Sequence, residues 1–218
     1  MRILVVAKSP VPGRVKTRLC PPLTLDEAAL VAEAALADTL DAVRASAAHE
    51  RVLALDGPPG PWLPEGFRIV PQRETSFAQR LTAAWEDCGG PALQIGMDTP
   101  QVTAALLDQS LETLADNDSV LGLAPDGGWW ALGLHSAQPD AFSGVPMSHH
   151  TTSLHQRRAL RRLGLHPALL SSIADVDTWD EAVAVAAVAP DGRFGHLVDE
   201  LSRRIASPHA NPGCGRAS

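Results

Sequence analysis

The chain has 218 residues, 45% of them hydrophobic, and a formal net charge of −7. This length and composition predict one globular domain with a sizeable core, and the acidic balance argues against a nucleic acid as partner, because binding a phosphate backbone needs a basic face. No apolar run approaches the ~20 residues that span a bilayer, and Lys8 interrupts the first one too early for a signal peptide. Cys20, Cys88 and Cys214 form no CxxC pair. We therefore expect a cytoplasmic protein without a membrane span or a structural zinc site.

The elements predicted along the chain alternate between strands and helices. Short apolar runs predict strands at 3–7, 51–56, 67–72, 92–98, 119–125 and 129–134. Helical spacing predicts helices at 23–47, 76–88, 99–117, 151–165, 178–189 and 196–206, the first with Thr24 or Asp26 as its cap. Such alternation is typical of a three-layer α/β/α fold with a mostly parallel central sheet. We expect a single domain over 1–206 and a disordered tail over 207–218.

The positive charge is concentrated at the N-terminus. Residues 1–25 contain no Asp or Glu but five cations, and Lys8 and Lys16 are the only lysines of the chain. Both lie in AKSPVPGRVKTRL, a segment broken by Pro and Gly that follows the first predicted strand. An acidic protein with one small basic island is typical of a local anionic ligand such as a nucleotide phosphate.

This basic segment matches neither of the two common nucleotide motifs. It has no G-x-G-x-x-G, and GRVKT lacks the glycine spacing of a P-loop. Lysine is a compact charge suited to phosphate, and arginine adds two-pronged contacts. A solvated basic turn is the alternative, but the clustering of both lysines and the missing acids favour phosphate binding.

Three acidic positions are candidates for chemistry, each with a structural alternative. Asp98 ends the buried run LQIGM and either caps the next helix or binds Mg²⁺, which takes one or two carboxylates together with water and phosphate oxygens. Asp177 in DVDTWDEA is a second carboxylate, although Thr178 and Glu181 there also form a capping-box pattern. Asp126 starts the turn DGG between two strands, which is equally a common hairpin signal.

Several motifs in order resemble one family of proteins. AKSPVPGRVKTRL, QRETSFAQRLTAAW, IGMDTP, APDGGWWALGL, VPMS and DVDTWDEA are similar to segments of bacterial transferases long catalogued as uncharacterised. These have the glycosyltransferase-A (GT-A) fold, a Rossmann-like fold of the nucleotide-diphospho-sugar transferase superfamily, and are related to nucleotidyltransferases acting on sugar or cofactor precursors. The resemblance runs from Met1 to about Ala189.

The resemblance implies roles for particular residues. It implies nucleotide or phosphate contacts from the basic segment and from the glycines of the DGG turn, a Mg²⁺ or Mn²⁺ site, and catalytic residues beside them. The implied contacts are Ala7, Lys8, Gly13, Arg14, Lys16, Arg18, Gly127 and Gly128, the metal ligands Asp98 and Asp177, and the catalytic residues Asp98, Asp126 and Lys16.

The resulting hypothesis is a metal-dependent transferase that takes a nucleotide-activated donor and a small-molecule acceptor. Among such donors we favour a nucleotide sugar. A nucleotidyltransferase is the alternative. A nucleotide-binding module without catalysis is a third possibility, because Met97 and Trp129 depart from the family pattern.

Other polar clusters are set aside. His149, His150 and His155 lack the spacing of a zinc motif, and the arginines of 157–162 fit a solvated helix face. Trp129 and Trp130 alternate across a strand, so we expect one in the core and the other beside a ligand.

Overall fold

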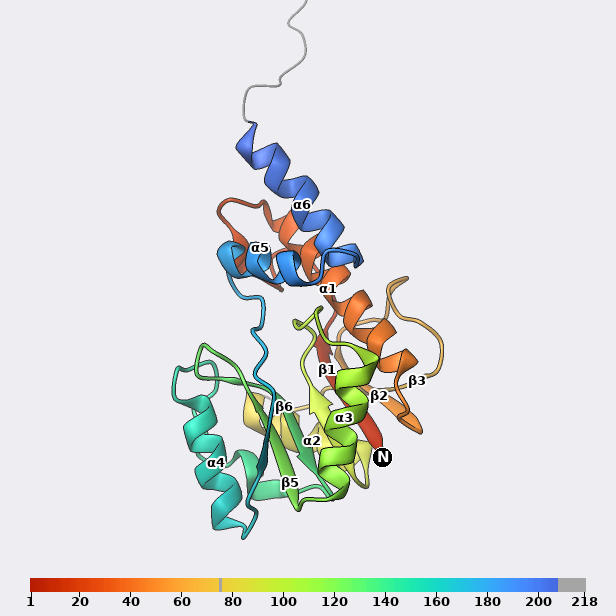
Figure 1. Ribbon diagram of the computed structural model, residues 1–218, viewed down its shortest axis with the longest axis vertical. Coiled ribbons are helices and arrows are strands. Elements are labelled where there is room, and N and C mark those ends of the chain that lie inside the picture. Colours follow the sequence, from red (N-terminus) through yellow and green to blue (C-terminus); the bar gives the residue numbers. More distant parts are fainter. Residues whose placement is uncertain (75, 208–218) are drawn as a thin grey trace, which may run out of the picture.

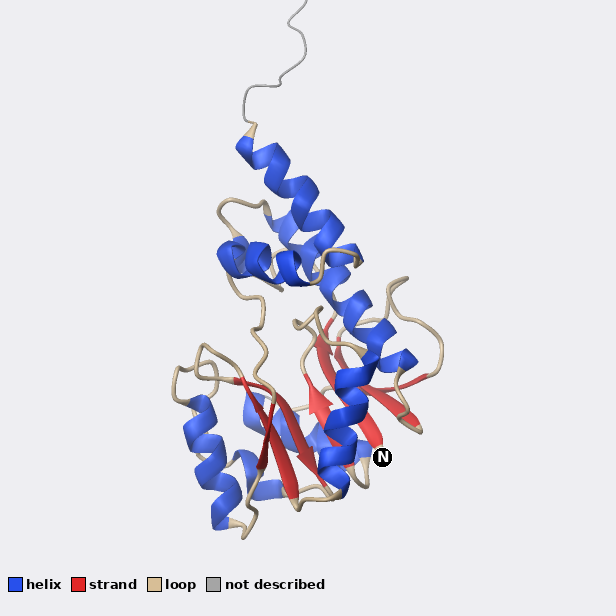
Figure 2. Cartoon of the chain, in the orientation of Figure 1, coloured by secondary structure: helices blue, strands red, loops and turns tan. Residues whose placement is uncertain are grey.

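The computed structural model describes residues 1–74 and 76–207, so the predicted tail lies, apart from Ser207, outside the described residues. A seven-stranded sheet of order β3-β2-β1-β4-β6-β5-β7 carries helices on both faces (Figures 1 and 2). The strands are β1 (Arg2–Lys8), β2 (Glu50–Asp56), β3 (Phe67–Pro71), β4 (Ala92–Ile95), β5 (Ser119–Leu123), β6 (Trp129–Leu134) and β7 (Ala168–Leu170). The helices are α1 (Leu25–Ala45), α2 (Phe77–Cys88), α3 (Ala104–Ala115), α4 (Thr152–Arg162), α5 (Trp179–Val188) and α6 (Arg193–Ala206).

The sheet is parallel except at one strand. β1 pairs in parallel with β2 and β4, as do β2 with β3 and β5 with β7, whereas β6 runs antiparallel to both β4 and β5. The predicted mostly parallel α/β sheet is thereby confirmed. The antiparallel β5–β6 pair contains the DGG turn at its tip.

Successive side chains of the strands pack into two separate hydrophobic cores, one on each face of the sheet. Ile3 and Val5 of β1 pack with α1 and α3, and Leu4 packs on the opposite face with α2 and α4. A strand places successive side chains on opposite faces, so a continuous apolar run serves both cores at once. This explains why the run in β1 shows no alternation of polar residues.

A small helical group lies beyond the carboxyl ends of the parallel strands. α5 and α6 pack against the first half of α1, as Figure 1 shows, around a core that includes Phe194 and Val198. Leu19, the last residue of the basic segment, and Leu23 just after it are buried in the same core, 0% and 4% exposed. The cationic loop is therefore fixed at its C-terminal end.

Two local features differ from the sequence-based expectation. The helix expected just beyond Asp98 begins only at Ala104, where the Thr103 side chain accepts a hydrogen bond from the Leu106 N–H. The short strand β7 was not predicted, because Ala168–Leu170 is half-exposed at the sheet edge and too short to show a pattern. The first difference bears on the site, since it frees Asp98 from the role of helix cap.

None of the helices in the described ranges has both the length and the apolar character needed to cross a membrane.

Candidate active site

A cavity of about 420 Å³ lies at the carboxyl ends of β1 and β4. Most of the residues predicted from the sequence line it. They are Ala7, Lys8, Arg14, Lys16, Arg18, Asp98, Asp126, Gly128 and Asp177. The chain thus gathers on one rim of the sheet cations and carboxylates that lie far apart in the sequence, such as Lys16 and Asp177, which are 161 positions apart.

The predicted Gly13 and Gly127 do not line this cavity. Gly13 has φ +77° in the basic segment, and Gly127 has φ +91°, where a β-carbon would lie 1.9 Å from the backbone oxygen of His150. Only glycine fits such a left-handed and crowded position. The structure therefore places Gly127 as the point where the hairpin tip contacts the start of α4, and Gly128 as the residue facing the cavity.

An extended segment before α5 brings further carboxylates to Asp98. The Val176 N–H donates to the Asp98 carbonyl oxygen at 3.1 Å, and the Gln101 amide donates to the Ala174 carbonyl oxygen. Val176 is 1% exposed in the helical core. Side chains alternate along an extended chain, so Asp175 and Asp177 lie on the side opposite Val176.

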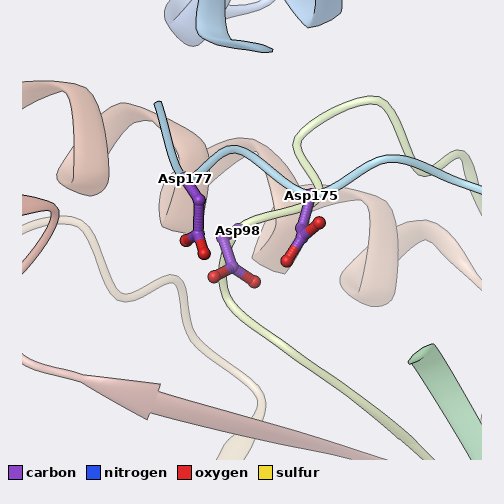
Figure 3. Close-up of side chains that lie close together, drawn as sticks. All are labelled: Asp98, Asp175 and Asp177. Carbon is purple, nitrogen blue, oxygen red and sulfur yellow. The ribbon is translucent and has the colours of Figure 1, made fainter. Parts of the chain in front are cut away.

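Asp98, Asp175 and Asp177 form a carboxylate cluster (Figure 3). One oxygen from each lies within 4.8 Å of the others, and all three residues are half-buried. Thr178, not Asp177, caps α5, in a reciprocal capping box with Glu181. Neither Asp98 nor Asp177 is needed as a helix cap, which leaves both side chains free for the cavity.

Lys16 lies between two of these carboxylates. Its Nζ donates to Asp98 Oδ2 at 2.8 Å and to Asp177 Oδ1 at 3.0 Å, and its side chain is only 9% exposed. Burial on its own would lower the pKa of this ammonium, but the charges of the two aspartates and the hydrogen bonds to them outweigh it, so the pKa is raised. Lys16 therefore stays protonated and holds the two carboxylates together.

Asp175 was missed by sequence reasoning. Burial, followed by the charges of Asp98, Asp126 and Asp177, raises its pKa to about 6. Unlike Asp98 and Asp177, it has no salt bridge among the described residues. The signal was present in DVD, because two aspartates separated by one residue share a face of an extended chain.

The other cations surround the cluster. Arg18 pairs with Asp177 at 3.1 Å, and Arg14 lies 3.7 Å from Asp56. Lys8 lines the cavity and makes no salt bridge within the described part of the chain; its backbone N–H contacts the Met97 sulfur at 3.2 Å. Lys8 is thus the cation most free to bind an anionic group.

The hairpin tip supplies the opposite wall. Asp126 Oδ1 accepts the Gly128 N–H at 2.7 Å, which fixes an exposed carboxylate at the cavity. Trp130 is 3% exposed in the core, whereas Trp129 lines the cavity, as the alternation of the two tryptophans predicted. His149 also lines it, and the three histidines form no metal-binding group among the residues described.

The donor set fits a divalent cation such as Mg²⁺ or Mn²⁺. Carboxylate oxygens are the ligands that these ions prefer. Two carboxylates ~4 Å apart repel by about 4 kcal/mol at an effective dielectric near 20. Lys16 compensates Asp98 and Asp177 but forms no salt bridge with Asp175, whose pKa is raised by burial first and then by the neighbouring negative charges. An added cation would relieve this repulsion.

The fold is that of the nucleotide-diphospho-sugar transferases. A protein from Desulfovibrio desulfuricans G20 named "putative nucleotide-diphospho-sugar transferase" superposes with a TM-score of 0.83 at 23% identity, over 94% of this chain and 96% of that one. 2-C-methyl-D-erythritol 4-phosphate cytidylyltransferase from Thermus thermophilus gives 0.51 at 18% identity (87% and 99% covered). A cytidylyltransferase from Leptospira borgpetersenii gives 0.52 at 10% identity (98% of each).

More than half of the sequence also matches one protein family. Residues 29–149 match the model described as "Uncharacterized protein conserved in bacteria (DUF2064)", and the chain belongs to this family. The matched range contains Asp98 and Asp126, while the basic segment and Asp177 lie outside it. No curated protein sequence matches the chain.

Proposed function

We propose that the protein is a metal-dependent transferase that transfers a sugar from a nucleotide diphosphate to a small-molecule acceptor. The observation that carries this proposal is the contact of Lys16, from the basic segment, with Asp98 and Asp177 in the cavity beyond β1 and β4. In parallel α/β sheets, ligands bind at this edge. On this proposal the cations of the site would bind phosphate, and its carboxylates would bind a divalent cation.

We propose different roles for the cationic and the acidic residues of the site. Lys8, Arg14 and Arg18 would donate charge-assisted hydrogen bonds to the diphosphate oxygens. Asp98, Asp175 and Asp177 would hold the divalent ion, which as a Lewis acid stabilises negative charge on a leaving phosphate. Lys16 would keep the carboxylates in place and add positive charge next to the same oxygens. These roles are proposals for this chain.

In the proposed transfer, one bond to the anomeric carbon is formed and another is broken. An acceptor hydroxyl forms a bond to the anomeric carbon, the bond from that carbon to the diphosphate breaks, and the nucleoside diphosphate leaves with the electron pair. Asp126, held across the cavity by the Gly128 N–H, is the carboxylate we propose as acceptor of the hydroxyl proton. Positioning of the two reactants supplies much of the remaining rate.

Nucleotidyl transfer is the second candidate, because the same fold is shared with two cytidylyltransferases over 98% or more of their chains. There the phosphate-binding segment would take a nucleoside triphosphate, and a phosphorylated acceptor would attack its α-phosphate and release pyrophosphate. The products separate the two reactions.

The test measures binding and products together. The protein is screened by thermal shift against nucleoside di- and triphosphates and nucleotide sugars, with Mn²⁺ and with EDTA, and the positive combinations are assayed for nucleoside diphosphate and pyrophosphate. We expect metal-dependent stabilisation that is lost in Asp98→Asn and kept in Glu200→Gln, a charge-matched change at an exposed position of α6. Binding without either product would identify a non-catalytic module. No binding by the parent, or equal binding by Asp98→Asn, would refute the proposed site.

A further inference from the structure

The cavity has a second end that the charged residues do not explain. Away from the carboxylate cluster it runs between α2 and the segment before α4, and there Phe77, Leu81, Trp129 and Met147 line it. None of these side chains carries a charge. A diphosphate at the charged end would occupy only part of the space.

One buried amide side chain lies at this end of the cavity. Gln94 of β4 lines the cavity although it is only 3% exposed, and it lies on the face of the sheet that α2 covers. β4 reads Ala-Leu-Gln-Ile, so an amide replaces the apolar side chain that its neighbours would predict. A buried amide costs free energy unless its hydrogen bonds are made.

The orientation of this amide is fixed by a tryptophan. The Trp85 indole Nε1–H donates to Gln94 Oε1 at 2.5 Å, and Trp85 is 1% exposed. The indole nitrogen can only donate, so the amide oxygen must face Trp85 and the NH₂ group must point the other way. That NH₂ group makes no hydrogen bond with any described residue. A second N–H beside the cavity, the Trp129 Nε1–H, is buried and also lacks an acceptor in the described part of the chain.

We infer that Gln94 is a specificity-determining donor, which binds an oxygen of an uncharged ring attached to the diphosphate. Two neutral N–H donors without acceptors, among aromatic and aliphatic walls, fit a ring that has apolar faces and a carbonyl or hydroxyl oxygen. Asp98 lies four positions after Gln94, so the Cα atoms of the two residues are at most about 14 Å apart. This is the scale of a diphosphate with one ring. The ring is either the nucleobase or the sugar, and both offer this chemistry.

The inference rests on the proposed function, and its test uses one probe for each end of the cavity. Inorganic pyrophosphate with Mn²⁺ reports on the charged end alone. UDP, CDP and GDP add a base, and UDP-glucose and GDP-mannose add a sugar as well. Dissociation constants are measured by calorimetry for the parent, for Gln94→Met, which keeps the side-chain length, and for Trp85→Phe, which removes the indole donor that orients the amide.

We expect Gln94→Met to bind pyrophosphate like the parent and to bind the best nucleotide probe about 3- to 10-fold more weakly, the effect of one neutral hydrogen bond. Weaker binding already with the nucleoside diphosphate assigns Gln94 to the base, and weaker binding only with the nucleotide sugar assigns it to the sugar. Trp85→Phe, which leaves the NH₂ group present but no longer oriented, should show a smaller loss with the same probe.

Two results would overturn the inference while the proposed function stands: unchanged affinity of Gln94→Met for every nucleotide probe, or an equal loss for pyrophosphate, which would show general damage to the cavity. If the parent binds neither pyrophosphate nor any nucleotide, the proposed function itself fails and the inference with it.

Discussion

The ammonium nitrogen of Lys16 lies 3.0 Å from an oxygen of Asp177, a residue 161 positions later in the chain. The same nitrogen contacts Asp98, so one nearly buried cation joins two carboxylates from distant segments. Removing this ammonium group leaves three neighbouring carboxylates with much less positive charge beside them. Its effect on stability and its effect on ligand binding can therefore be separated by adding or removing a divalent cation.

Lys16→Met should lower the stability of the protein in EDTA by about 1–2 kcal/mol, because partly buried carboxylates lose a hydrogen-bonded partner. Added Mn²⁺ should restore more stability to this variant than to the parent, since the ion would supply the missing charge. Thermal unfolding with and without Mn²⁺ measures both effects. Lys8→Met is the control, because Lys8 has no salt bridge to lose among the described residues. Equal melting temperatures for both variants in EDTA would contradict this account.

Asp175→Asn should act in the opposite direction on stability. The parent carries a charge there that is half-buried and close to Asp98, Asp126 and Asp177. Removing it should stabilise the protein in EDTA by on the order of 1 kcal/mol. The same change should weaken stabilisation by Mn²⁺ several-fold, because a ligand is lost. Thermal-shift measurements during a titration of Mn²⁺ into both proteins test this prediction. A variant that is less stable in EDTA and binds Mn²⁺ normally would show that Asp175 has a structural role only.

The two lysines should differ in chemical reactivity. Acylating reagents attack the neutral amine, and the raised pKa of Lys16 together with its 9% exposed side chain should protect it. Lys8, which faces the cavity, should be labelled first, and a bound nucleotide with Mn²⁺ should slow this labelling at least several-fold. Peptide mapping by mass spectrometry measures both sites at once. Preferential labelling of Lys16 in the folded protein would show that its contacts with the carboxylates do not persist in solution.

Cys88 should be unreactive in the folded state. It is 2% exposed, and burial raises the pKa of its thiol to about 11. At pH 8 only roughly one thiol in a thousand would be ionised. The neutral thiol is the form that folding favours, so this contribution to stability is complete below about pH 9 and is lost as the pH rises towards 11.

Iodoacetamide at pH 8 should therefore modify Cys88 only after unfolding, and peptide mapping distinguishes it from the other two cysteines. Cys20, which is half-buried, serves as the internal comparison. Modification of Cys88 at the same rate in native protein and in urea would contradict the packing described here.

Glu27 should stabilise the junction of α1 and α6 in a pH-dependent way. A hydrogen bond from Arg204, followed by one from the Thr24 N–H, lowers the pKa of Glu27 below 4.5. The ionised form is favoured by folding, so its contribution is present above pH 4.5 and is lost as the pH falls through the lowered pKa. Glu27→Gln keeps the capping geometry and should cost at most about 1 kcal/mol at pH 7.

As the pH falls through the lowered pKa of Glu27, the difference between Glu27→Gln and the parent should shrink, since both side chains then become neutral. Melting temperatures from pH 3 to 7 test this expectation. A constant difference across that range would show that the charge of Glu27 does not contribute.

The sequence predicted the sheet and the cationic loop well because both depend on local patterns. Apolar runs define strands, and the absence of acids around Lys8 and Lys16 is visible in the letters alone. The start of α3 was wrong by five residues, because IGMDTP has good capping residues at 98 and 99 although the structure uses Thr103. The structure caps α3 with Thr103, and the Asp98 side chain accepts a hydrogen bond from Lys16 instead.

The carboxylate cluster depended on contacts that no local pattern contains. The hydrogen bond from Val176 to the Asp98 carbonyl aligns two segments far apart in the sequence, and only this alignment makes Asp175 a member of the cluster. Gln94 was read as part of a buried strand, and its importance depends on Trp85, which lies on the facing helix. A polar residue inside an apolar run was the available signal.

The attachment of Asp175 and Asp177 to the segment that leads into α5 has a consequence for biosynthesis. The ribosome makes the basic loop and Asp98 first, whereas the two remaining carboxylates emerge after more than three quarters of the chain. Until then Lys16 has at most one of its two partners. The proposed metal site would therefore stay incomplete until the segment that leads into α5 has docked against Asp98.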